Sequence, residues 1–190
     1  KVPLLFLILL MLVVQIKVFR SVKDVNSARE QAALALELGV NDEQSLFVLH
    51  PKIDRLRTIA AKASAENISI FAFYPYKDQR ERLGTILQPD ASSKRCEPST
   101  LKVEALVKDS EFHRISFIAK SAPEKRGVKR LLIVSNGNRI VGMALSFISK
   151  REKTPLDHSL FHGYVISNYD SAALSFVDQL SGCYGALILE

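Results

Sequence analysis

An apolar run at the start of the chain restricts where the N-terminal segment can fold. Residues 2–16 (VPLLFLILLMLVVQI) contain a single polar residue, Gln15, and no charge. A helix of about 20 apolar residues crosses the hydrocarbon core of a bilayer, and Lys17 can reach the interface so that the residues after it add to the span. A core helix would instead need protein around every face, which a domain of this size rarely offers. The run therefore predicts one transmembrane helix, with residues 1–23 forming the anchor and the juxtamembrane segment.

Charges around this run bear on the side of the membrane that the rest of the chain faces. No small-x-small cleavage signal follows the run, so a cleaved signal peptide is not expected. Lys17, Arg20 and Lys23 lie just after it and, by the positive-inside rule, favour a cytoplasmic domain. Lys1 argues for the opposite orientation. We therefore expect a single-pass membrane protein that contacts lipid through its N-terminal helix, with the domain on the cytoplasmic side.

The remaining residues, 24–190, are enough for a single domain with its own hydrophobic core. Apolar residues make up 47% and charged residues 24% of the chain, as in ordinary globular proteins. The net charge of +6 is modest, and aromatic residues are not interleaved with the cations, which argues against sequence-reading contacts with nucleic acid. Cysteine and histidine do not occur at zinc-like spacing, and we expect neither a metal nor a cofactor.

The chain has two cysteines, Cys96 and Cys183. Neither belongs to a CxxC pair, and two reduced thiols are the simpler interpretation. The alternative is a disulfide between them, which requires an oxidising compartment. That disulfide would reverse the expected orientation and would favour an extracytoplasmic sensor domain.

The first half of the domain is predicted to be mainly helical. Residues 24–39 and 51–66 have helical spacing of apolar residues, with Gly39 placed to end the first helix and Pro51 suited to the first turn of the second. A strand is expected from Asn67 until Pro75 stops it, buried on both faces because it is almost continuously apolar. Further helices are expected over residues 77–87 and 99–109.

The second half is predicted to be rich in strands. Asn136 and Gly137 separate two apolar runs, which is a strong hairpin signal because both residues tolerate positive φ. The expected elements are strands over residues 112–120, 129–134, 139–149 and 163–167, a helix over 169–180 and a short last strand over 187–189. The order of elements predicts an α/β (α+β) fold with a mixed central sheet flanked by helices.

Residues 128–137 (VKRLLIVSNG) have the rhythm of a motif on a strand that leads into a hairpin. They resemble the phospholipase D family, in which each half-domain carries His-x-Lys-x4-Asp-Gly at this point. Val128 stands in place of the His, Arg130 in place of the Lys and Ser135 in place of the Asp. The resemblance covers about residues 45–185. It implies a degenerate half-domain without phosphodiesterase activity, in which Arg130 still binds an anion.

Two histidines near residue 160 lie close to a serine and an aspartate, the residue types of a hydrolase site. His158 and His162 flank Ser159, with Asp157 beside them. A Ser/His/Asp site needs these residues apart in sequence and a nucleophile on a tight turn, and no GxSxG motif occurs. A surface loop between two strands is therefore the preferred interpretation of this segment, and no catalytic residue is predicted.

Lys125, Arg126, Lys129 and Arg130 form the densest cluster of cations in the chain. On a loop before a strand they would meet phosphate or lipid headgroups, unless they are only solvated surface. The leading hypothesis is a membrane-anchored, non-catalytic module that binds a partner protein or ligand as a subunit or accessory of a membrane complex. The alternatives are a membrane-surface hydrolase acting on phosphate esters and the extracytoplasmic sensor.

Overall fold

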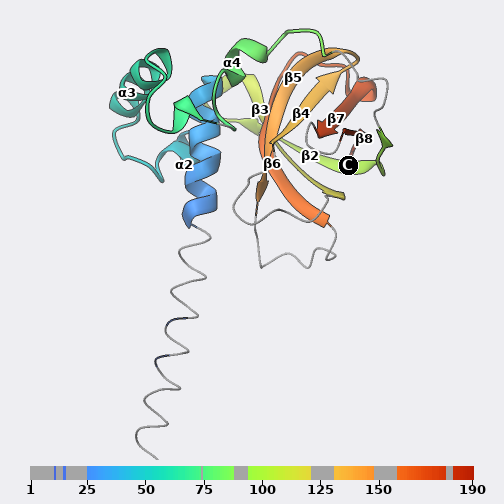
Figure 1. The fold of residues 1–190 in the computed structure, drawn as a ribbon, viewed down its shortest axis with the longest axis horizontal. Coiled ribbons are helices and arrows are strands. Elements are labelled where there is room, and N and C mark those ends of the chain that lie inside the picture. The colour runs from blue at the N-terminus through green and yellow to red at the C-terminus, as the bar shows by residue number, and fades with distance from the viewer. Residues whose placement is uncertain are drawn as a thin grey trace, which may run out of the picture.

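The computed structural model describes residues 25–73, 75–87, 94–120, 131–147, 158–178 and 182–190, together with Met11 and Gln15. The first part of this chain is helical and packs against one side of a barrel built by the second part (Figure 1). We call residues 25–87 the helical unit. It consists of a helix over 25–38, α2 (Glu43–Leu46), α3 (Ile53–Ala65), the 3-10 turn η1 (Ser69–Ala72) and α4 (Gln79–Arg82).

Eight strands follow among the described residues. They are β1 (Lys94–Arg95), β2 (Ser99–Leu106), β3 (Asp109–Lys120), β4 (Leu131–Asn136), β5 (Arg139–Phe147), β6 (His158–Ile166), β7 (Leu174–Asp178) and β8 (Cys183–Leu189), with a short 3-10 turn η2 (Ser171–Ala173) before β7. The order in the sheet is β8-β2-β3-β6-β5-β4-β7, and β7 pairs back to β8. This last pairing closes the sheet into a barrel. Strands β1 and β2 both pair with β8 in parallel, β1 near the start of β8 and β2 near its end.

The hydrophobic core has two layers because several strands bury both faces. Along β4, Leu132 and Val134 point into the barrel, while Leu131 and Ile133 point outward against the helical unit. The helix over 25–38 supplies the opposing surface, with Leu34 and other side chains completely buried. Alternate residues of an extended strand face opposite sides, so one strand joins both layers.

The expected fold class, a mixed sheet flanked by helices, is wrong. The strands close on one another, and the described helices cover one side of the barrel only (Figure 1). Residues 99–109 and 169–180, both expected to be helical, instead provide strands β2 and β7. Buried and exposed residues alternate along β2, as expected of a strand: Leu101 is buried, while Thr100 and Lys102 are exposed.

The expected buried strand from Asn67 is also wrong. Ser69–Ala72 form the 3-10 turn η1, in which Phe71 is buried, and Phe73 directly after it is 69% exposed. Asn67 and Ser69 both have positive φ, which breaks an extended backbone. A closed ring of strands offers this segment no free edge, and strand formation requires pairing.

Several elements predicted from local sequence are confirmed. The helix over 25–38 ends at Gly39, which has φ of 77° and whose N–H donates to the Leu36 carbonyl. Helix α3 lies within the predicted range 51–66. The hairpin between β4 and β5 turns at Gly137, with Asn136 paired to Arg139. The predicted helix over 77–87 shortens to α4.

The predicted membrane anchor requires correction. No helix in the part of the chain that the structure describes is both long enough and apolar enough to span a bilayer. Apart from Met11 and Gln15, the segment 1–23 lies outside the described residues. The assignment as a single-pass membrane protein is therefore withdrawn.

Candidate functional site

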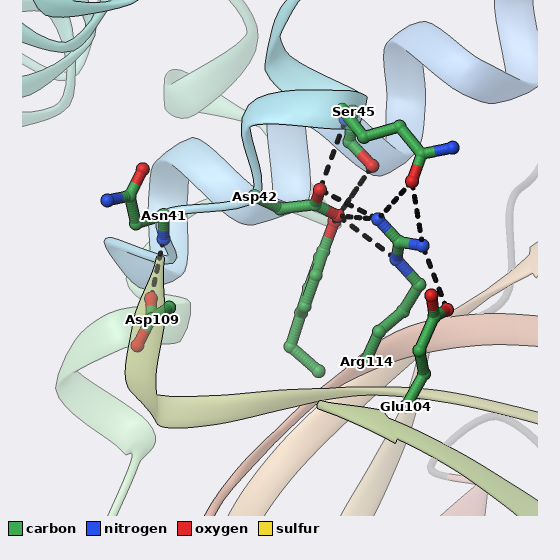
Figure 2. Close-up of polar contacts among 8 residues, drawn as sticks. Asn41, Asp42, Ser45, Glu104, Asp109 and Arg114 are labelled. Atoms are coloured by element: carbon green, nitrogen blue, oxygen red, sulfur yellow. Dashed lines mark hydrogen bonds and ion pairs between the residues drawn. The ribbon is translucent and has the colours of Figure 1, made fainter. Parts of the chain in front are cut away.

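A buried charge cluster fastens the helical unit to the barrel (Figure 2). Asp42 caps the N-terminus of α2, its carboxylate accepting the Ser45 N–H at 3.2 Å and the Ser45 hydroxyl at 2.7 Å. From β3, Arg114 donates to the two Asp42 oxygens at 2.7 Å and 3.1 Å. From β6, the Tyr164 hydroxyl donates to the same carboxylate at 2.8 Å. We call these four residues the Asp42 cluster.

Burial and hydrogen bonding oppose each other at Asp42. The side chain is only 2% exposed, and burial alone would raise its pKa. Hydrogen bonds from Arg114, Ser45 and Tyr164 outweigh that effect and lower the pKa of Asp42 below its ordinary 3.8. Burial also opposes the charge of Arg114, yet Asp42 raises the pKa of the guanidinium. Asp42 and Arg114 are therefore an ion pair at neutral pH.

A second contact strengthens the same junction. The Asn41 N–H donates to the Asp109 carboxylate at 2.6 Å, and Arg57 of α3 donates to the Asn41 side-chain oxygen. Arg114 also bonds Glu104 of β2 at 2.9 Å. A cavity of about 310 Å³ lies beside the cluster, with Asn41, Asp42, Glu104 and Arg114 in its wall. The charged side chains Asp42, Glu104 and Arg114 in this wall already bond one another. The arrangement therefore suits a structural junction.

A different cavity lies within the helical unit, between the helix over 25–38, α3 and α4. Its volume is about 410 Å³. We call it the arginine cavity, and it is lined by Leu36, Glu37, Gly39, Val40, Arg57, Ala61, Ser64, Ala65 and Arg80. The Arg80 guanidinium lies over Gly39, where an added Cβ would be 3.1 Å from Cζ. Arg57 and Arg80 therefore both contribute to the wall of this cavity.

The two arginines of this cavity differ in the hydrogen bonds that they make within the fold. Arg57 is half-buried and bonds Asn41. Arg80 is exposed, and within the described chain its guanidinium makes neither a hydrogen bond nor an ion pair. A planar guanidinium presents several donors in a fork that matches oxyanions. Arg80 therefore keeps its donors available to a ligand in the cavity.

Glu37 lies in the wall of the same cavity and is 5% exposed. It accepts the Ser64 hydroxyl at 3.1 Å and the Gln79 N–H at 3.2 Å, so it joins three helices. Burial raises the pKa of Glu37 above its ordinary 4.5, and the nearby charge of Asp78 adds to this. The hydrogen bonds act in the opposite direction without cancelling the rise.

Cys96 and Cys183 are joined in a disulfide bond, with their Cα atoms 5.7 Å apart. This is the alternative that the sequence left open rather than the pair of reduced thiols. Cys96 directly follows β1, and its N–H donates to the Tyr184 carbonyl in β8 at 2.7 Å. The bond therefore lies at the point where β1 and β2 run along β8.

Of the residues considered from sequence for the basic cluster and the hydrolase site, only His158, Ser159 and His162 lie in the part of the chain that the structure describes. Lys125, Arg126, Lys129 and Arg130 lie outside the described residues, as does Asp157. His158, Ser159 and His162 belong to strand β6 and not to a surface loop. Residues four apart on a strand are separated by about 13 Å, so the two histidines do not converge. No group of three or more His, Cys, Asp and Glu among the described residues is placed to hold a metal.

The phospholipase D resemblance stays a prediction. Val128 and Arg130 lie outside the described residues, and the buried Ser135 hydroxyl lies 2.8 Å from that of Ser175. Comparison with known proteins adds nothing here, since no family model, curated protein or solved structure matches the chain. Function therefore has to be argued from the geometry itself.

Sequence reasoning did not single out the Asp42 cluster or the arginine cavity. One signal for the first was present, because Asp42 stands three residues before Ser45 in a polar link, as an N-cap does. Nothing local connects Asp42 to Arg114 or Tyr164, which lie 72 and 122 residues further along the chain. Arg57 and Arg80 likewise come from different helices.

Proposed function

We propose that this chain is a non-catalytic module that binds an anionic ligand in the arginine cavity and works in an oxidising compartment. The observation that carries ligand binding is that Arg57 and Arg80 both line the cavity, while the Arg80 guanidinium has no hydrogen-bond or ion-pair partner within the described chain. Charge-assisted hydrogen bonds to such groups are roughly twice as strong as neutral ones. An oxyanion is the ligand that satisfies both arginines.

The Asp42 cluster supports a binding role rather than a catalytic one. Its carboxylate accepts from Ser45, Arg114 and Tyr164 at once, and the ion pair is stabilised in its charged state. A general acid or base instead needs a pKa near the working pH. The cluster therefore serves to hold the helical unit in a fixed position on the barrel.

The disulfide supports the oxidising compartment. Such bonds persist in secreted and periplasmic proteins and are rare where glutathione keeps thiols reduced. The protein isolated from its natural source, alkylated without reductant, should leave Cys96 and Cys183 unlabelled. Labelling of both cysteines before reduction would contradict this part of the proposal.

Ligand binding can be tested by thermal unfolding with phosphate, sulfate, acetate and hexanoate at constant ionic strength. At least one anion should raise the melting temperature of the wild type saturably. The Arg57→Gln/Arg80→Gln double variant should lose that response. Arg55→Gln is the matched control, because Arg55 lies on the exposed face of α3 and outside the cavity.

Two results would count against the proposal. One is a double variant that responds to anions like the wild type, or a wild type that responds to none of them. The other is saturable hydrolysis of simple ester or phosphodiester substrates by the purified protein, which would show an enzyme.

A further inference from the structure

We infer that the arginine cavity selects a small monocarboxylate with an apolar body, an inference that rests on the anion-binding function proposed above. Three properties of the cavity point to such a ligand: its balance of charge, its largely apolar wall and its size.

The charge in the wall favours a single negative charge on the ligand. Arg57 and Arg80 bring two cations, while Glu37 brings one carboxylate in the same wall. Glu37 is held in place by Ser64 and by the start of α4, so it cannot turn away from the cavity without breaking those bonds. A dianionic phosphate would be repelled by this carboxylate, whereas a monocarboxylate leaves the site close to neutral.

Apart from Ser64, whose hydroxyl donates to Glu37, the rest of the wall is apolar. Leu36 lies in the last turn of the first helix and Val40 follows its end, while Ala61 and Ala65 lie one turn apart on α3. Ala61 and Ala65 are exposed, so the cavity opens between small side chains. Ligand pockets are commonly lined by apolar groups with a few polar groups that fix orientation, and about 400 Å³ is at the small end of their range.

A purely structural role for Arg80 would be to cap the end of the first helix. Its guanidinium lies over Gly39, where the first helix ends and the helix dipole is negative. A guanidinium that capped this end would donate to one of the last carbonyls, and Arg80 makes no such hydrogen bond within the described chain. The negative end of the helix dipole favours the Arg80 cation at this position, and its N–H donors remain available to a ligand in the cavity that Arg80 lines.

The experiment compares the dissociation constants of hexanoate, acetate and inorganic phosphate by isothermal titration calorimetry on the disulfide-bonded protein. Hexanoate should bind at least about tenfold more tightly than acetate, because only hexanoate contacts the apolar wall, and tenfold more tightly than phosphate. Ala61→Glu places a second carboxylate in the wall and should abolish hexanoate binding. Ala61→Gln is the matched control for size and should retain most of the binding.

The outcomes separate this inference from the function on which it rests. Equal affinity for acetate and hexanoate, or tighter binding of phosphate, would overturn the selectivity while anion binding stood. Equal loss of binding in Ala61→Glu and Ala61→Gln would also overturn it, since charge would not matter. Absence of any anion binding by the wild type would overturn both proposals.

Discussion

Asp42 occupies a position where a carboxylate is costly to bury and costly to lose. Its neighbours come from three elements: Ser45 in α2, Arg114 in β3 and Tyr164 in β6. A buried ion pair adds little stability compared with a well-packed apolar pair, but removing one partner leaves a charge without compensation. The importance of the cluster is therefore best measured by breaking it asymmetrically.

Replacement of Arg114 by alanine should lower the free energy of unfolding by about 3 kcal/mol, because it leaves the Asp42 carboxylate buried without its cation. Urea denaturation at neutral pH measures the change. Lys108→Ala is the matched control, because Lys108 pairs with Glu43 at 2.9 Å but both side chains are exposed. That change should cost less than about 1 kcal/mol. Equal losses in the two variants would contradict the assigned role of Arg114.

At the scale of elements, the β4–β5 hairpin depends on one backbone conformation. Gly137 has φ of 58°, and a Cβ added there would meet nothing within 4 Å. Gly137→Val should therefore cost about 1 kcal/mol or more through the backbone alone, since a β-branched residue resists positive φ. Thermal unfolding measures it. Gly137→Asn should cost less, because asparagine tolerates this region; an unchanged melting temperature in the valine variant would refute the argument.

The seam of the barrel at β8 depends on the disulfide. Cys96 and Cys183 are 87 residues apart, and in the chain-entropy model closing a loop of that length stabilises the folded state by about 4.5 kcal/mol. The Cys96→Ser/Cys183→Ser variant should unfold at a correspondingly lower urea concentration, with or without reductant. The wild type should move toward the variant only when reductant is added. Insensitivity of the wild type to full reduction would contradict this prediction.

The predicted elements that were right are those fixed by local chemistry. Gly39 ends a helix and Gly137 turns a hairpin because each conformation is decided within a few residues. Residues 99–109 were predicted to be helical because leucine, lysine, glutamate and alanine favour helices. Strand β2 instead pairs with β3 and with β8, whose residues lie more than 80 positions away. This pairing overrides helix propensity. The local sequence shows the alternation along β2 but does not indicate that its partner is β8.

The same limit applies to the candidate sites. The arginine cavity forms because α3 and α4 pack against the first helix, and the spacing of Arg57 and Arg80 in the sequence does not indicate it. The two cysteines could be paired in principle from sequence, since they are the only ones. That the two cysteines form a disulfide could not be predicted from the sequence, because the bond depends on β1 pairing in register with β8.

At the scale of the whole molecule, the helical unit and the barrel share one core layer and one ionic junction. Outward side chains of β4 and β5 pack against the helices, and the Asp42 cluster adds an ion pair between the helical unit and the barrel. The arginine cavity lies wholly within the helical unit. The barrel can affect its shape only indirectly, by packing against the helices that form its walls.

Two buried carboxylates should give the stability of the molecule opposite pH dependences. The pKa of Glu37 is raised in the folded state above 4.5, so the folded protein binds that proton more tightly than the unfolded chain. The stability from Glu37 is then present below about pH 4.5 and is lost as the pH rises through the folded pKa. The pKa of Asp42 is lowered below 3.8, so its contribution is present above that pH and is lost as the pH falls.

Urea unfolding of the wild type, Glu37→Gln and Asp42→Asn from about pH 3 to about pH 7 separates the two effects. The stability of the wild type relative to Glu37→Gln should decrease as the pH rises above about 4.5, because the buried carboxylate becomes charged. The stability of the wild type relative to Asp42→Asn should decrease as the pH falls below about 4, because the ion pair with Arg114 loses its anion. Parallel curves for either pair of proteins would mean that the carboxylate in question titrates alike in the folded and unfolded chains, and its place in a buried hydrogen-bonded site would then be wrong.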